Sequence, residues 1–141
     1  MDPDSIFLEK FDPYFREIEK ELQKTFHSRI PVIEEMGMHS LLGKGKRIRP
    51  LLFILSSRLC GYEGEDIYHI STMFEYVHCA SLLHDDVIDK ADMRRNKPSA
   101  SRVWGNSAAV LTGDFLSSRA IEIAVDTENM ELFKATTRIG R

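Results

Sequence analysis

The chain has 141 residues, of which 43% are hydrophobic and 29% are charged, and its formal net charge is −3 at pH 7. Acidic and basic residues are interspersed, which argues against a nucleic-acid-binding surface and against a polybasic membrane anchor. The longest apolar run, residues 51–55, is too short to span a bilayer, and no signal peptide is visible, so we expect a cytoplasmic protein without stable membrane insertion. Cys60 and Cys79 lack metal-ligand spacing and lie in apolar helical contexts, so we expect buried free thiols rather than a disulfide.

The predicted elements are helices from one end of the chain to the other, without strand alternation or internal repeats. Asp12 and Pro13 suit the N-cap and first turn of a first helix, whose apolar residues recur at helical spacing as far as Phe26. Gly61 is a suitable C-terminal cap for the third helix. The further helices are predicted at about residues 31–43, 50–60, 65–89 and 106–125 and from residue 128, with a polar loop at 90–105. The pattern predicts an all-α bundle.

The most informative stretch is residues 83–95, which contains four aspartates and ends with two arginines. Asp85 and Asp89 stand four residues apart and share one face of a helix, with Asp86 turned about 100° to the side. Such carboxylates repel each other unless cations lie between them, and Mg²⁺ prefers carboxylate, phosphate and water oxygens. Arg94 and Arg95 suit bidentate binding of phosphate. A solvated acidic helix end is the alternative, but neighbouring apolar pairs indicate a buried helix.

A second segment, residues 43–50, places glycines beside Lys46, Arg47 and Arg49. Taken alone, this segment is a weak signal, because glycine and lysine are common neighbours in loops. Combined with the aspartate run, it indicates a site for a metal ion and diphosphate groups.

These motifs resemble the N-terminal half of the trans-isoprenyl diphosphate synthases, the polyprenyl synthetase family. The first aspartate-rich motif of the family matches residues 85–89, its G-K-x-x-R element matches residues 45–49 and its arginine pair matches residues 94–95. Further matching stretches are residues 97–99, 104–106 and 109–114. Lys44 is a small departure, because the commoner family form has glycine there. The resemblance implies an isoprenoid-synthase-type helical bundle, of which residues 1–141 would be the N-terminal part of a single domain.

The family also carries a second aspartate-rich motif, and no second D-D-x-x-D occurs in this sequence, which ends at Arg141 within a predicted helix. We therefore expect the N-terminal half of a longer enzyme, ended by truncation or tryptic trimming rather than by a natural stop codon. We also expect this part alone to be inactive, with the apolar face of its fourth helix exposed.

The resemblance implies head-to-tail condensation of isopentenyl diphosphate with an allylic diphosphate. The product would be longer than farnesyl diphosphate, either octaprenyl-like or geranylgeranyl. By resemblance, Asp85, Asp86 and Asp89 are catalytic and bind Mg²⁺, and Arg94 assists them in binding the allylic diphosphate. The diphosphate of isopentenyl diphosphate is assigned to Lys46, Arg49, His78 and Arg95. The resemblance also implies a homodimer, and no nucleic acid is expected as a partner.

Helix geometry adds residues to the predicted cleft. His78 lies seven residues before Asp85, about 20° around the helix and roughly 10 Å below it. A lone histidine is more commonly a core residue, and the resemblance reverses that preference. Ser81 lies one turn below Asp85 with Ala80 beside it, and Phe74 lies about 16 Å below. We expect Ala80, Ser81 and Phe74 to set product length, although Phe74 is also consistent with a core aromatic.

Other functions account less well for these motifs. An HD-type phosphohydrolase would use His84 and Asp85 with His69 or His78 as a further metal ligand, but this leaves Asp89 and the arginine pair unexplained. We expect His84 to pack or hydrogen-bond beside the aspartates instead. A non-catalytic subunit of a heteromeric prenyl synthase is disfavoured by the intact aspartate motif. A terpene cyclase is disfavoured by residues 45–49 and by the arginine pair.

Overall fold

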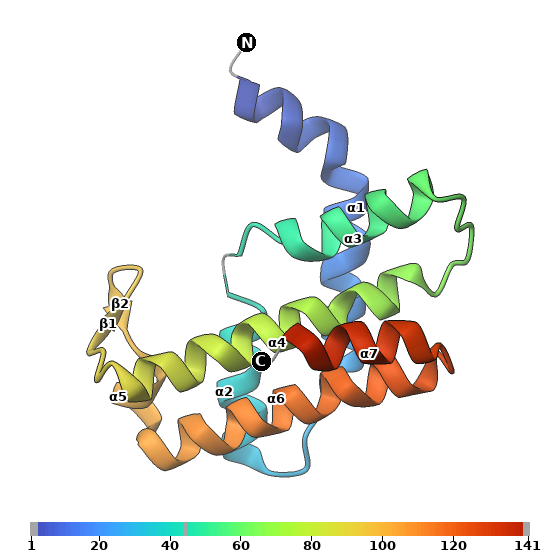
Figure 1. Ribbon diagram of the computed structural model, residues 1–141. Helices are drawn as coiled ribbons and strands as arrows, with labels where there is room; N and C mark the ends of the chain where they lie inside the picture. Colours follow the sequence, from blue (N-terminus) through green and yellow to red (C-terminus); the bar gives the residue numbers. More distant parts are fainter. Residues whose placement is uncertain (1–2, 44, 140–141) are drawn as a thin grey trace.

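The computed structural model describes residues 3–43 and 45–139, and these residues form seven helices and one short hairpin. The elements in chain order are α1 (Pro3–Thr25), α2 (Pro31–Leu41), α3 (Ile48–Leu59), α4 (Ile67–Ile88), β1 (Met93–Arg94), β2 (Lys97–Pro98), α5 (Ala100–Trp104), α6 (Asn106–Asp126) and α7 (Met130–Ile139). The predicted all-α class is confirmed. In Figure 1, α4 crosses the middle of the molecule, with α3 along one side and α6 along the other.

The core lies around α4, which contacts α1, α3 and α6 and is therefore buried around much of its circumference. Tyr76 of α4 is fully buried, and its ring centroid lies 6.4 Å from that of Phe26 at the end of α1. Phe26 in turn meets Phe115 of α6 edge to face, with ring centroids 6.0 Å apart. The hydroxyl of Tyr76 lies 3.0 Å from Oγ1 of Thr25, which satisfies a polar group that burial would otherwise penalise.

The expectation of an exposed apolar face on the fourth helix is wrong. Among the large apolar side chains of α4, all of which the structure describes, only Ile88 in the last turn is exposed. The others are buried or half-buried, because the neighbouring helices pack against α4 on several sides.

The first helix begins ten residues earlier than its sequence pattern predicts. Pro13 lies inside α1 on an exposed surface, and Asp12 forms an ion pair with Arg16 at 2.6 Å rather than an N-cap. An internal proline removes one backbone hydrogen bond and favours a helix end at this point. Aromatic contacts bridge the position, since the ring of Phe7 lies 4.8 Å from that of Phe11 and 6.5 Å from that of Phe15.

The segment predicted as a polar loop contains three regular elements, two short strands and a short helix. β1 and β2 pair antiparallel across a turn of Arg95 and Asn96, whose φ angles are +49° and +62°. Ser99 then caps α5: its hydroxyl accepts a hydrogen bond from the Arg102 amide at 3.2 Å and donates one to the Ala91 carbonyl at 2.5 Å. Strands of two residues are too short to produce a visible alternation, and no glycine marks the turn. The hairpin is thereby tied to the end of α4.

The other predicted helices and the Gly61 cap agree with the structure to within a few residues, and Gly61 has a φ of +86° just after α3. Both cysteines are free, and Cys79 is buried as expected, whereas Cys60 is exposed because it follows the last turn of α3. Over the described part of the chain, every helix is either too short or too polar to cross a bilayer.

Candidate functional site

A cavity of about 970 Å³ lies where the segment after α2, the start of α3, the middle of α4 and the hairpin meet. The cationic side chains that line it are Lys46, Arg47, Arg49, Arg94, Arg95 and Lys97, and His78 lines it as well. The two carboxylates in its wall, Glu75 and Asp86, are each paired with an arginine. The cavity therefore suits a polyanionic ligand.

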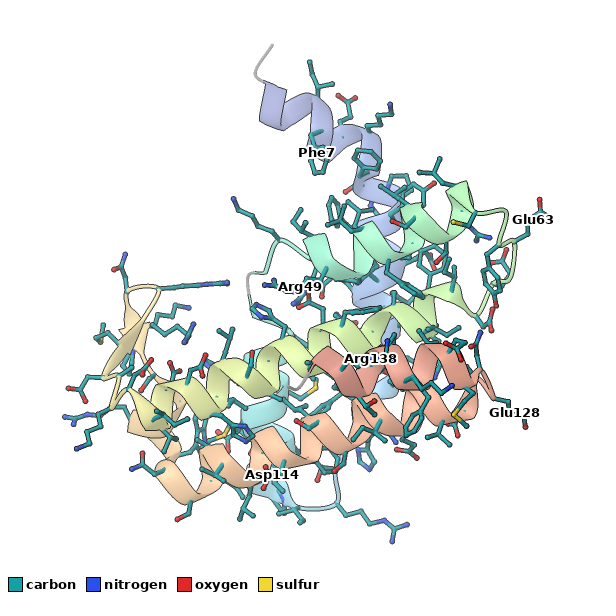
Figure 2. All side chains as sticks on the ribbon, in the orientation of Figure 1. Phe7, Arg49, Glu63, Asp114, Glu128 and Arg138 are labelled. Atoms are coloured by element: carbon teal, nitrogen blue, oxygen red, sulfur yellow. The ribbon has the colours of Figure 1, made fainter. Side chains whose placement is uncertain are left out.

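In the segment between α2 and α3, one cationic side chain is buried and two others are exposed. Arg47 has a left-handed backbone conformation, with a φ of +49°, and its side chain is buried. Lys46 and Arg49 on either side of it are exposed and line the cavity. Figure 2 shows Arg49 at the start of α3 on the side of the hairpin. The structure thus brings together the two residues of this segment that the resemblance assigns to a diphosphate.

The three motif aspartates lie in two different environments. Asp85 and Asp89 are exposed at the end of α4, as expected for one helix face. Asp86 is buried and accepts hydrogen bonds from Arg94, from Nε at 2.9 and 3.0 Å and from Nη2 at 2.6 Å. The hydrogen bond to Asp86 raises the pKa of Arg94, against a smaller opposing effect of burial. Asp86 thus has Arg94 as its partner, which the sequence did not predict.

The described residues contain no group of three acidic, histidine or cysteine side chains arranged to hold a metal ion. Asp85 and Asp89 nevertheless fit the ligand preferences of Mg²⁺, because they offer exposed carboxylate oxygens on one face and leave coordination positions for phosphate and water.

His78 lies between two cavities. It lines the large basic cavity, and it also lines a second cavity of about 240 Å³ together with Arg49, Phe74, Val77 and Ser81. Burial lowers the pKa of His78, and the positive charge of Arg49 lowers it further. The imidazole is therefore neutral at pH 7 and can donate or accept a hydrogen bond. A cationic surface and an apolar surface meet at His78.

Of the three residues predicted to set product length, two line a cavity and one is buried in the core. Ser81 and Phe74 line the second cavity, and the Ser81 hydroxyl donates to the His78 carbonyl at 2.8 Å. Ala80 is only 2% exposed, belongs to the hydrophobic core and is not among the residues that line either cavity. Helix geometry alone had placed Ala80 beside the cleft, whereas the structure turns it inward.

His84, which was expected to pack or hydrogen-bond beside the aspartates, contacts α6. Its Nε2 lies 3.2 Å from the Val110 carbonyl and 3.3 Å from Oδ1 of Asp114. A Cβ at Gly113 would lie 2.3 Å from the same nitrogen, so only glycine leaves room for the ring. His84 therefore points to a different neighbour from His78, which argues against the shared metal site of an HD-type phosphohydrolase.

Three charged residues that line the cavity had been given no role in the site from the sequence: Arg47, Glu75 and Lys97. A signal for Glu75 was present, because a carboxylate within the apolar stretch 73–77 of a buried helix requires a partner. Nothing in the spacing identified Arg47 as that partner.

Comparison with known proteins agrees with this geometry. The family model described as polyprenyl synthetase matches residues 30–140. The octaprenyl diphosphate synthase of Haemophilus influenzae is 39% identical over 121 residues, and component 2 of the heptaprenyl diphosphate synthase of Bacillus subtilis is 42% identical over 106 residues. These alignments cover 86% and 75% of this chain but only 37% and 30% of the relatives.

A solved structure of the same kind is the polyprenyl synthase of Caulobacter crescentus complexed with calcium and isoprenyl diphosphate. It superposes with a TM-score of 0.85 at 31% identity, over 93% of this chain and 40% of that protein. The decaprenyl diphosphate synthase of Rhodobacter capsulatus superposes with a TM-score of 0.83 at 32% identity, over 98% of this chain and 44% of that protein. The chain thus spans well under half of these relatives, and it belongs to the polyprenyl synthetase family.

Proposed function

We propose that the complete protein carrying this chain condenses isopentenyl diphosphate head to tail with an allylic diphosphate and releases pyrophosphate. Residues 1–141 would form the N-terminal part of its single synthase domain. The observation that carries the proposal is the meeting of two cavities at Arg49 and His78, one strongly cationic and the other bordered by Phe74 and Val77. Such a junction suits a substrate with a diphosphate head and a hydrocarbon tail.

Lys46, Arg49, His78 and Arg95 would bind the diphosphate of isopentenyl diphosphate. The three cations supply charge-assisted hydrogen bonds, and the neutral imidazole supplies one further donor at the edge of the apolar cavity. Fixing the head group in this way would aim the double bond away from the basic cavity and towards the allylic carbon.

Asp85 and Asp89 would hold Mg²⁺, which supplies positive charge for the departing allylic diphosphate when it is bound. Asp86 holds the guanidinium of Arg94 at the edge of the cavity, where Arg94 would assist in binding the allylic diphosphate. The two diphosphates would thus be held by separate groups, as a reaction between two anionic substrates requires.

The test is prenyl transfer by the complete protein, measured with labelled isopentenyl diphosphate, an allylic diphosphate and Mg²⁺. Asp85→Asn and Asp89→Asn should each lower kcat by at least about a hundredfold, because carboxylate charge next to a metal acts mainly in the transition state. The matched control is Asp126→Asn at the exposed end of α6. Near-normal turnover of either motif variant would contradict the proposal.

Assembly offers a second candidate, in which the protein works only with a different subunit. The Bacillus subtilis relative carries the name component 2, which supports an enzyme made of unlike chains. We favour a cytoplasmic homodimer, and the purified protein alone should then be active. Activity that appears only after a second chain is added would support the heteromer.

A further inference from the structure

One buried guanidinium joins four parts of the molecule beside the basic cavity. Arg47 donates from Nε to Oε1 of Glu19 in α1 at 2.5 Å and from Nη1 to Oε2 of Glu75 in α4 at 3.2 Å. Its Nη2 donates to the carbonyl of Leu41 at the end of α2 and to the carbonyl of Gly43 at 3.2 Å. Only 4% of the side chain is exposed. Arg47 therefore fixes the segment that carries Lys46 to three surrounding helices.

The backbone at Arg47 depends on these bonds. A left-handed conformation costs an L-residue about 1–2 kcal/mol, and Arg47 has a φ of +49° directly before α3. The turn at this residue leaves Lys46 and Arg49 exposed to the cavity while the side chain between them is buried. Gly45 leaves room for the arrangement, because a Cβ there would lie 2.8 Å from Nη1 of Arg47.

Arg47 also changes the charge of the cavity wall. Glu75 lines the cavity, is 5% exposed and would repel a diphosphate if its charge were not balanced. Burial alone would lower the pKa of Arg47, but the hydrogen bond to Glu19 and the charges of Glu19 and Glu75 outweigh burial and raise it. The guanidinium is therefore charged, and it offsets part of the negative charge of Glu75 in the wall.

We propose that Arg47 is a positioning residue for the diphosphate of isopentenyl diphosphate: it holds Lys46 and Arg49 in place and offsets the charge of Glu75 without contacting the ligand. This inference rests on the proposed function, because it takes the ligand of the basic cavity from there. It predicts a selective effect on one of the two substrates.

The experiment measures KM for each substrate and kcat in the complete protein, together with calorimetric binding of isopentenyl diphosphate. Arg47→Gln should raise KM for isopentenyl diphosphate roughly ten- to a hundredfold and change KM for the allylic substrate less than about threefold. Arg47→Lys keeps the charge but loses most of the bonds, so its KM should fall in between. The matched control is Arg58→Gln, which removes a guanidinium from the other end of α3.

Adding Glu75→Gln to Arg47→Gln should recover part of the affinity for isopentenyl diphosphate, because it removes the carboxylate that has lost its partner. A merely structural role predicts no such recovery and equal losses for both substrates. Unchanged KM values in Arg47→Gln, or in Arg47→Lys if the glutamine variant does not fold, would overturn the inference while leaving the proposed function intact. If the unmodified protein fails to bind isopentenyl diphosphate, the proposed function itself fails.

Discussion

The environment of His78 disfavours the protonated form of its imidazole. It is partly buried, and Arg49 lies on the side of the basic cavity, so both surroundings lower its pKa below the ordinary value of 6.5. In the unfolded chain His78 lacks these surroundings and has its ordinary pKa. Just below pH 6.5 the unfolded chain therefore binds more protons at His78 than the folded chain does. Folding therefore becomes less favourable as the pH falls through this range.

We predict that the free energy of unfolding of the unmodified chain falls more steeply than that of His78→Gln between about pH 7.5 and pH 5.5. The glutamine keeps hydrogen-bonding capacity but cannot acquire the proton. Urea unfolding at several pH values measures both proteins directly. Parallel pH curves for the two would show that the surroundings of His78 do not penalise its charge.

We predict that product length depends on Ser81, which lies one turn below Asp85. Ser81 lines the small apolar cavity, so Ser81→Phe in the complete protein should block a growing tail and yield shorter products at similar initial rates. The control is Ser118→Phe on the exposed surface of α6. Chromatography of dephosphorylated products provides the measurement. Because Ala80 is buried in the core, Ala80→Phe should instead destabilise the fold. An unchanged product distribution in Ser81→Phe would remove Ser81 from the path of the tail.

The packing of α2 against Phe26, the residue that follows α1, depends on a glycine within the helix. Gly37 is buried, and a Cβ there would lie 2.0 Å from the tip of the Phe26 ring and 2.8 Å from each Cε. The ring has little freedom to move, because Tyr76 and Phe115 pack around it. The close approach of α2 to this ring therefore requires glycine at position 37.

Gly37→Ala should destabilise the chain by about 1–3 kcal/mol through overpacking, although alanine is favoured over glycine in a helix by about 1 kcal/mol. Denaturant unfolding measures the change. In a Phe26→Leu background the shorter side chain should make the alanine less costly, which a double-mutant cycle detects. A stabilised Gly37→Ala variant would show that α2 does not rest on the ring.

The sequence predicted the elements that are stabilised by their own periodicity. It did not predict the features that depend on contacts between side chains. α4 and α6 are long and apolar, so their periodicity located them to within two residues. The start of α1 was missed because Pro13 is a local signal for a helix start, whereas the aromatic contacts that extend the helix are between side chains. Likewise, spacing predicted the shared face of Asp85 and Asp89. Spacing could not predict the pairing of Asp86 with Arg94, because Arg94 reaches Asp86 only through the fold of the hairpin.

At the scale of the whole molecule, stability is unevenly distributed. α4 and α6 pack along each other in the middle of the chain, whereas the first turns of α1 project away from the bundle (Figure 1). Ile6 and Phe7 are 48% and 40% exposed. Segments with few buried contacts open without global unfolding.

We expect hydrogen exchange in the 141-residue chain to be slowest in α4 and α6, with protection near the global free energy of unfolding. Amides before Asp12 should exchange fastest among the helices, because their hydrogen bonds break by local fraying. Mass spectrometry of proteolytic fragments resolves these regions. Equal protection throughout α1 and α4 would mean that the aromatic contacts hold the first turns as firmly as the core.

At the hairpin turn, selection for stability and selection for diphosphate binding should favour different residues. Arg95 occupies a turn position with a φ of +49°, where glycine would be free of a penalty of about 1–2 kcal/mol. A library of variants screened only for heat resistance should accumulate Arg95→Gly, whereas a screen for diphosphate binding should retain arginine, whose side chain lines the basic cavity. Sequences recovered from the two screens would diverge at this position. An arginine retained at this turn would therefore indicate selection for ligand binding at the expense of backbone stability.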